Sequence, residues 1–66
     1  MARQYEFVFV ESGTGDTVDI KAFGNTRSSA ERTARGKLRR DHHKDPTRFY
    51  TRSTRHIPEH ERARSG

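Results

Sequence analysis

Apolar and polar residues alternate near the N-terminus. In the segment 5–10, Tyr5, Phe7 and Phe9 share one face of a strand by the two-residue period, with Val8 and Val10 on the other. Residues 12–16 contain two glycines, which supply the positive φ that a tight turn needs, and alternation then resumes over residues 17–23. Residues 4–23 therefore predict a β-hairpin.

The apolar period changes after Gly24. Three small or apolar residues now recur every fourth position, which predicts a helix from about residue 29 to about residue 40: Ala30, Ala34 and Leu38. Ser28 and Glu31 have the spacing of a capping box at its start. Because Pro46 disfavours helical geometry before it, we expect a loop over 41–46 and a third strand over 47–57.

This order, β-β-α-β, predicts the α+β class: a three-stranded sheet with one helix packed on one face. We expect one domain over residues 1–58 and a flexible polar C-terminal tail over residues 59–66. One helix covers only one face of the sheet, yet both faces of the first strand are apolar. We expect the aromatic set inside, because three large rings are much of the scarce apolar material. Bare aromatics would instead offer a stacking platform, and bare valines a dimer or protein-binding surface.

The composition leaves little material for a core. Only ten of the 66 residues are Leu, Ile, Val or Phe, and there is no cysteine to form a disulfide. Stability must then come from good local propensity, a bound partner or a homodimer. The N-terminus lacks the pattern of a secretion signal and no apolar run reaches 18 residues. We therefore expect a cytoplasmic protein that does not enter a membrane.

Charge is distributed unevenly along the chain. Residues 1–24 carry two basic and four acidic side chains, whereas residues 25–66 carry twelve and five. Eleven of the fourteen basic residues are arginines, which pair bidentately with phosphate or carboxylate and stack on planar rings. A polyanion, and nucleic acid first, is the partner that this distribution favours.

Two basic sets are the candidate contacts. The predicted helix carries Arg32, Arg35 and Arg39, flanked by Lys37 and Arg40. The predicted third strand carries Arg48, Tyr50 and Arg52 on one face, with Arg55 on the other unless the strand bends. Each set also has a plainer interpretation. In that interpretation, the helix set is the solvated side of an amphipathic helix. The strand set protects an exposed sheet edge, while Phe49 or Tyr50 fills the core.

The sequence gives little support for catalysis or for a cofactor. Four histidines suggest a metal site, but no cysteine completes the usual zinc sets and Pro58 separates His56 from His60. His42 or His43 beside Arg39 is the one local combination with general acid-base chemistry. Neither a phosphate-binding glycine loop nor a nucleophile motif is present. We expect no enzyme, no cofactor and no metal.

The sequence thus predicts a small basic nucleic-acid-binding protein, with DNA slightly favoured over RNA, that contacts the phosphate backbone through arginines. An accessory or regulatory role, and a viral or mobile-element origin, suit such a protein. The alternative is a protein–protein interaction module: a small inhibitor, adaptor or homodimer that binds an acidic partner surface. Convergence of the arginines on one surface free of acids favours nucleic acid, and their spread beside an apolar patch favours a protein partner.

Overall fold

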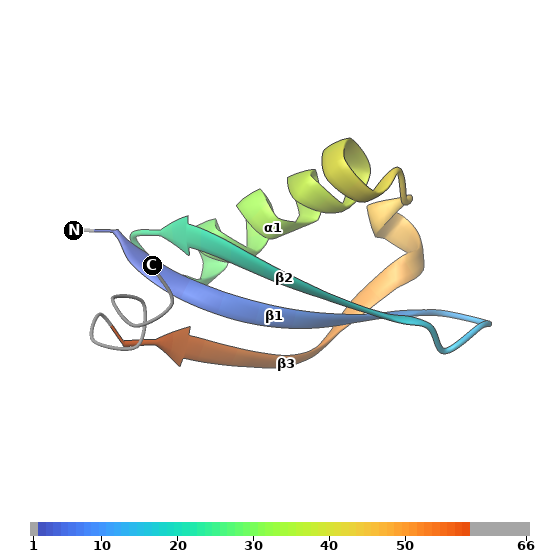
Figure 1. Ribbon diagram of the computed structural model, residues 1–66, viewed down its shortest axis with the longest axis horizontal. Coiled ribbons are helices and arrows are strands. Elements are labelled where there is room, and N and C mark those ends of the chain that lie inside the picture. The colour runs from blue at the N-terminus through green and yellow to red at the C-terminus, as the bar shows by residue number, and fades with distance from the viewer. Residues whose placement is uncertain (1, 59–66) are drawn as a thin grey trace.

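The computed structural model describes residues 2–58, and the predicted tail over 59–66 lies outside them. The elements are β1 (Arg3–Glu11), β2 (Thr17–Gly24), α1 (Arg27–His42), the 3-10 helix η1 (Pro46–Arg48) and β3 (Phe49–Ile57). The strands form one antiparallel sheet in the order β2-β1-β3. Helix α1 packs against one face of that sheet, mainly over β2 (Figure 1). The predicted α+β fold, with its β-β-α-β order, is confirmed.

The hairpin has the predicted position and slightly longer strands. Its turn is closed by two backbone hydrogen bonds, from Glu11 N to Asp16 O at 2.8 Å and from Gly15 N to Glu11 O at 3.0 Å. Gly13 and Gly15 have φ values of 96° and 79°, a region that side chains with a Cβ rarely adopt. The two glycines therefore set the turn that brings β2 beside β1.

Helix α1 begins two residues before its predicted start. Thr26 is the N-cap: its hydroxyl accepts a hydrogen bond from Ser29 N at 3.2 Å, and Ser29 Oγ accepts one from Thr26 N at 3.1 Å. The predicted capping box of Ser28 and Glu31 is therefore wrong. Glu31 instead lies one turn further along, where its carboxylate accepts a hydrogen bond from Thr51 of β3.

The helix also ends two residues later than predicted. His43 adopts the left-handed conformation at the C-cap, with φ 55°, and Lys44 N donates to Leu38 O at 3.0 Å. Asp45 then caps η1 by accepting from Thr47 N at 3.0 Å. Residues 46–48 consequently form a helical turn, and the third strand begins at Phe49 rather than at residue 47.

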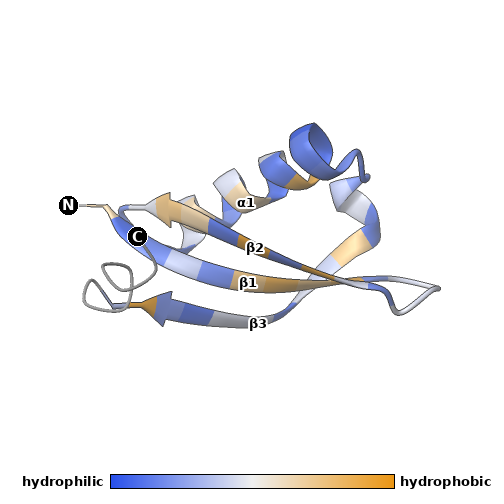
Figure 2. Cartoon of the chain, in the orientation of Figure 1, coloured by the Kyte–Doolittle hydropathy of each residue, from blue (hydrophilic) through white to orange (hydrophobic). Residues whose placement is uncertain are grey.

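The core lies between α1 and the sheet face that it covers. Phe7, Phe9 and Leu38 are fully buried, which confirms the prediction that the aromatic face of the first strand is the inner one. Strand β2, helix α1 and strand β3 supply the other residues of this core: Ile20, Ala22, Ala30, Ala34 and Phe49. Figure 2 shows that most of the helix surface is hydrophilic. The last turns of the helix are the most strongly hydrophilic part.

A β-bulge interrupts the pairing of β3 with β1. Ser53 is opposite Val8 and Thr51 is opposite Phe9, so that Arg52 is an extra residue between the two pairs. Before the bulge, Tyr50 pairs with Val10 on the face turned away from α1, which we call the outer face. The bulge changes the phase of alternation, so the odd-numbered residues of β3 after it lie on the outer face.

Candidate nucleic-acid interface

One side of α1 faces η1 and the start of β3, which it contacts through Arg35 and Glu31. Residues four apart on a helix share a side, and four charged residues follow this spacing: Arg27, Glu31, Arg35 and Arg39. The opposing segment contributes Asp45, Arg48, Thr51 and Arg52. We call these eight residues the α1–β3 seam. It holds five arginines and two carboxylates.

Arg35 braces the helix to the segment that follows it. Its Nη1 donates to Pro46 O at 3.1 Å and to Phe49 O at 3.3 Å, and its Nη2 lies 3.6 Å from Glu31 Oε2. The guanidinium also lies over the Phe9 ring, 5.3 Å from the centroid. These contacts use the donors that a phosphate would need, so we assign Arg35 a structural role within the site.

Two other members of the predicted helix set lie on the opposite side of α1. Lys37 Nζ donates to Lys21 O of β2 at 2.8 Å. Arg40, three residues further on, shares that side and lies 3.1 Å from Asp41 through its Nε. The hydrogen bond from Arg40 lowers the pKa of the Asp41 carboxyl. The structure therefore separates Lys37 and Arg40 from the seam.

Arg32 and Arg39 are exposed and lie seven residues apart, two turns along the same side of the helix. Arg39 also approaches the start of β3. The pKa of Asp45 is lowered first by its hydrogen bonds from Thr47, and then by the charges of Arg39 and Arg48. The charges of both arginines thus act on the carboxylate that caps η1. Arg39 and Arg48 come from different elements, α1 and η1.

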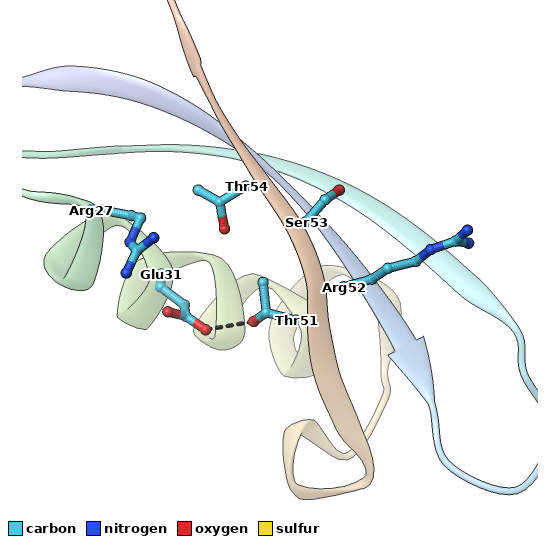
Figure 3. Close-up of a pocket in the computed structure, with 6 residues that line it drawn as sticks. All are labelled: Arg27, Glu31, Thr51, Arg52, Ser53 and Thr54. Atoms are coloured by element: carbon cyan, nitrogen blue, oxygen red, sulfur yellow. Dashed lines mark hydrogen bonds between the residues drawn. The ribbon is translucent and has the colours of Figure 1, made fainter.

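A groove of about 350 Å³ lies at the other end of the seam (Figure 3). Its lining is polar: Arg27, Glu31, Thr51, Arg52, Ser53 and Thr54. Thr51 donates its hydroxyl hydrogen bond to Glu31, and the Arg52 side chain extends away from that pair. Sequence reasoning missed Arg27 because it placed the helix start at residue 29. The four-residue spacing from Arg27 to Glu31 and Arg35 was the available signal.

The bulge rearranges the second predicted set. Phe49 is 5% exposed and belongs to the core, whereas Tyr50 is 53% exposed on the outer face, so one ring of the pair is internal as expected. Arg55 lies on the same face as Tyr50, with its Nη2 3.4 Å from Glu6 Oε1. The strand therefore does bend, in the way that brings Arg55 toward Tyr50. Arg48 belongs to η1 and not to the strand.

The convergence that nucleic-acid binding requires is met in part. Of the predicted arginines Arg32, Arg35, Arg39, Arg48 and Arg52, three belong to the seam and are exposed: Arg39, Arg48 and Arg52. Arg32 is exposed on the neighbouring turn of the helix, and Arg35 is engaged inside the protein. The surface also contains Glu31 and Asp45, so it is basic without being free of acids.

Within residues 2–58 no three histidine or acidic side chains are grouped so that they would hold a metal ion, and His60 lies outside that range. His42 and His43 are exposed at the end of α1. None of the helices in the described part of the chain has the length and apolar character needed to cross a membrane. Comparisons with protein-family models, with curated proteins and with solved structures find no match.

Proposed function

We propose that the protein binds nucleic acid through the phosphate backbone, with the arginines of the α1–β3 seam as the principal contacts. The observation that carries this proposal is that Arg27 and Arg52, from α1 and β3, line one polar groove, while the charges of Arg39 and Arg48, from α1 and η1, both act on Asp45. Guanidinium groups match phosphate oxygens in geometry and charge. Four such groups from a helix, a turn and a strand edge form a surface suited to a polyanion.

The two carboxylates of the seam offset part of this charge, and five arginines against two carboxylates leave a net charge of +3. Glu31 accepts from Thr51 and pairs with Arg35, and Asp45 accepts from both the backbone and the hydroxyl of Thr47. Their oxygens are thus directed toward groups of the protein itself. The exposed arginines keep donors that are free to meet an incoming phosphate.

The proposal makes binding strongly dependent on salt. Each phosphate neutralised on a duplex contributes about −0.9 to the slope of log K against log salt concentration, so four contacts give a slope near −4. We expect fluorescence anisotropy with a labelled duplex to show this slope between about 50 and 200 mM NaCl. Duplex DNA, duplex RNA and the corresponding single strands are compared in parallel, because backbone contact alone does not choose among them.

A pair of neighbouring arginines provides the matched test. Arg39 belongs to the seam and Arg40 lies on the other side of α1, so Arg39→Gln and Arg40→Gln remove the same charge from adjacent positions. We expect Arg39→Gln to reduce the magnitude of the salt slope by about 1 and Arg40→Gln to leave it unchanged. Arg35 is unsuitable for this test, because its loss disturbs the packing of η1.

Two results contradict the proposal. The first is the absence of binding to any of the four nucleic acids at low salt. The second is an equal loss in Arg39→Gln and Arg40→Gln, which would mean that net charge and not the seam determines affinity. Circular dichroism spectra of both variants establish that each retains the fold of the wild-type protein.

A further inference from the structure

Strand β3 has an exposed edge that is free of acidic side chains. The sheet order β2-β1-β3 leaves β3 paired on one side only. Residues 46–57 contain three arginines and no aspartate or glutamate. The helix lies mainly over β2, and within residues 2–58 no element covers the outer face of β3 (Figure 1).

Tyr50 is the large ring on this part of the outer face. Its side chain is 53% exposed, and the residue pairs with Val10 of the central strand. Val10 is only 7% exposed although no helix covers this face, so its cross-strand neighbours Tyr50 and Thr17 shield it. A ring that is held at a strand position with half of its surface exposed offers a flat, rigid surface for stacking.

The bulge brings basic groups to the same side as this ring. Strict alternation would place Tyr50 and Arg52 on one face and Arg55 on the other. Because Arg52 is the inserted residue, Arg55 shares the outer face with Tyr50, and the Arg52 side chain extends away from Glu31 and Thr51 (Figure 3). Residues 50–55 span roughly 15 Å along the strand. Tyr50 is thus followed along β3 by Arg52 and then by Arg55, whose guanidinium pairs with Glu6 of β1 on the same face.

From this arrangement we propose that the outer side of β3 binds an unpaired nucleic-acid strand, with one base stacked on Tyr50 and adjacent phosphates near Arg52. The inference rests on the proposed function and names its substrate as single-stranded. A duplex keeps its bases stacked inside the helix and cannot present a free base face to the ring. A strand that passes along β3 can still reach the seam, because Arg52 also lines the groove.

The absence of tryptophan from the chain allows a direct test of stacking. Tyr50→Trp introduces a single tryptophan, whose emission is quenched when a base stacks on the indole. Phe23→Trp is the matched control, because Phe23 is 48% exposed on β2, at the other end of the outer face. We expect oligo-dT and oligo-U to quench Tyr50→Trp by more than about half and to leave Phe23→Trp nearly unchanged. The two oligonucleotides distinguish DNA from RNA.

Affinity provides the second measurement. Tyr50→Thr removes the ring and keeps a residue suited to a strand, and Tyr50→Phe keeps the ring and removes only the hydroxyl. We expect Tyr50→Thr to bind oligo-dT about 5- to 100-fold more weakly and Tyr50→Phe to stay close to wild type. Binding of a duplex should not change in either variant. Thermal unfolding followed by circular dichroism shows that the variants are folded.

The possible failures can be told apart. Unquenched Tyr50→Trp, or equal losses for the single strand and the duplex in Tyr50→Thr, overturns this inference while salt-dependent duplex binding through Arg39 still stands. If the wild-type protein binds no nucleic acid at low salt, both the proposed function and this inference are wrong. Quenching by single strands with no response to the duplex supports both.

Discussion

The two edge strands of the sheet present opposite surfaces from the same backbone geometry. β2 carries Asp19 and Lys21, lies under the helix, and has the carbonyl of Lys21 occupied by Lys37. β3 carries Arg52 and Arg55 with no acidic residue, is interrupted by a bulge, and is tied to the helix at Phe49 and Thr51. Either device, a covering lysine or a bulge, protects an edge against unwanted strand pairing.

Protection of an edge and recognition of a partner need not be separate tasks. Lys37 occupies one carbonyl of β2. The arginines and the bulge of β3 also blunt an edge, yet they leave charged groups and an aromatic ring exposed. In our proposal, the exposed groups of β3 serve binding as well as protection, whereas β2 serves the fold. Substitutions at each edge can separate its contribution to stability from its contribution to binding.

Replacement of Gly24 should have the largest effect on stability, because it acts where β2 meets α1. A Cβ at this position would lie 2.8 Å from Ala30 Cα and even closer to Ala30 N, and backbone cannot move aside cheaply. We expect Gly24→Ala to lower the free energy of unfolding by about 3 kcal/mol in urea titrations. Gly36→Ala is the control: nothing lies within 4 Å, and alanine should raise stability by up to about 1 kcal/mol.

Truncation of the two helix-to-edge contacts should have unequal effects. Arg35→Ala removes two hydrogen bonds to carbonyls and the contact with the Phe9 ring, and we expect a loss of about 2 kcal/mol. Lys37→Ala removes one exposed contact with β2 and should cost less than about 0.5 kcal/mol. Denaturant unfolding of both variants checks the order, and equal losses would contradict the bracing role of Arg35.

Binding should respond to one edge only. Arg52→Gln removes a single phosphate contact, which corresponds to roughly eightfold weaker binding at 0.1 M salt. Lys21→Gln removes the same charge from β2, and we expect its affinity to remain within about twofold of wild type. Anisotropy titrations with one labelled strand measure both. If Lys21→Gln is impaired as much as Arg52→Gln, the difference between the edges has no bearing on function.

The smallest expected effect is on the pH dependence of stability, through Asp45 in the segment before β3. The pKa of Asp45 is lowered in the folded protein, so this carboxylate stabilises the fold above its unfolded pKa, and that contribution is lost as pH falls through the folded pKa. Asp45→Asn keeps a capping oxygen without a titrating group. Stability measured from pH 5 down to pH 2 should fall less steeply in this variant than in wild type. An identical slope would rule out the contribution.

The hairpin, the helix and the choice of inner face could be predicted because apolar periodicity specifies them. The third strand has no such periodicity between its apolar ends. Phe49 and Ile57 are eight residues apart, which strict alternation places on one face, yet Phe49 pairs opposite Glu11 on the inner face and Ile57 opposite Gln4 on the outer face. Only the backbone pairing reveals the extra residue between them.

The site was predictable in composition and less so in detail. Charge asymmetry directed the hypothesis to residues 25–66, but the sequence could not show that Arg35 reaches two backbone carbonyls across a loop. The N-cap of α1 could not be assigned from the sequence for a similar reason. Thr26, Ser28 and Ser29 all have a hydroxyl that can accept from a helix amide, and the path of the chain after β2 determines which one does.

Because Arg52 is an inserted residue, the length of β3 determines which of its side chains face the helix. Deleting one residue there would restore uniform pleating, and everything on one flank of the deletion would exchange its inward and outward sides. Either Phe49 would leave the interior, or Arg55 would turn toward the helix. The turn at residues 12–16 is exposed and closed by backbone hydrogen bonds, so a change of length there should alter the hairpin without exchanging the two sides of β3.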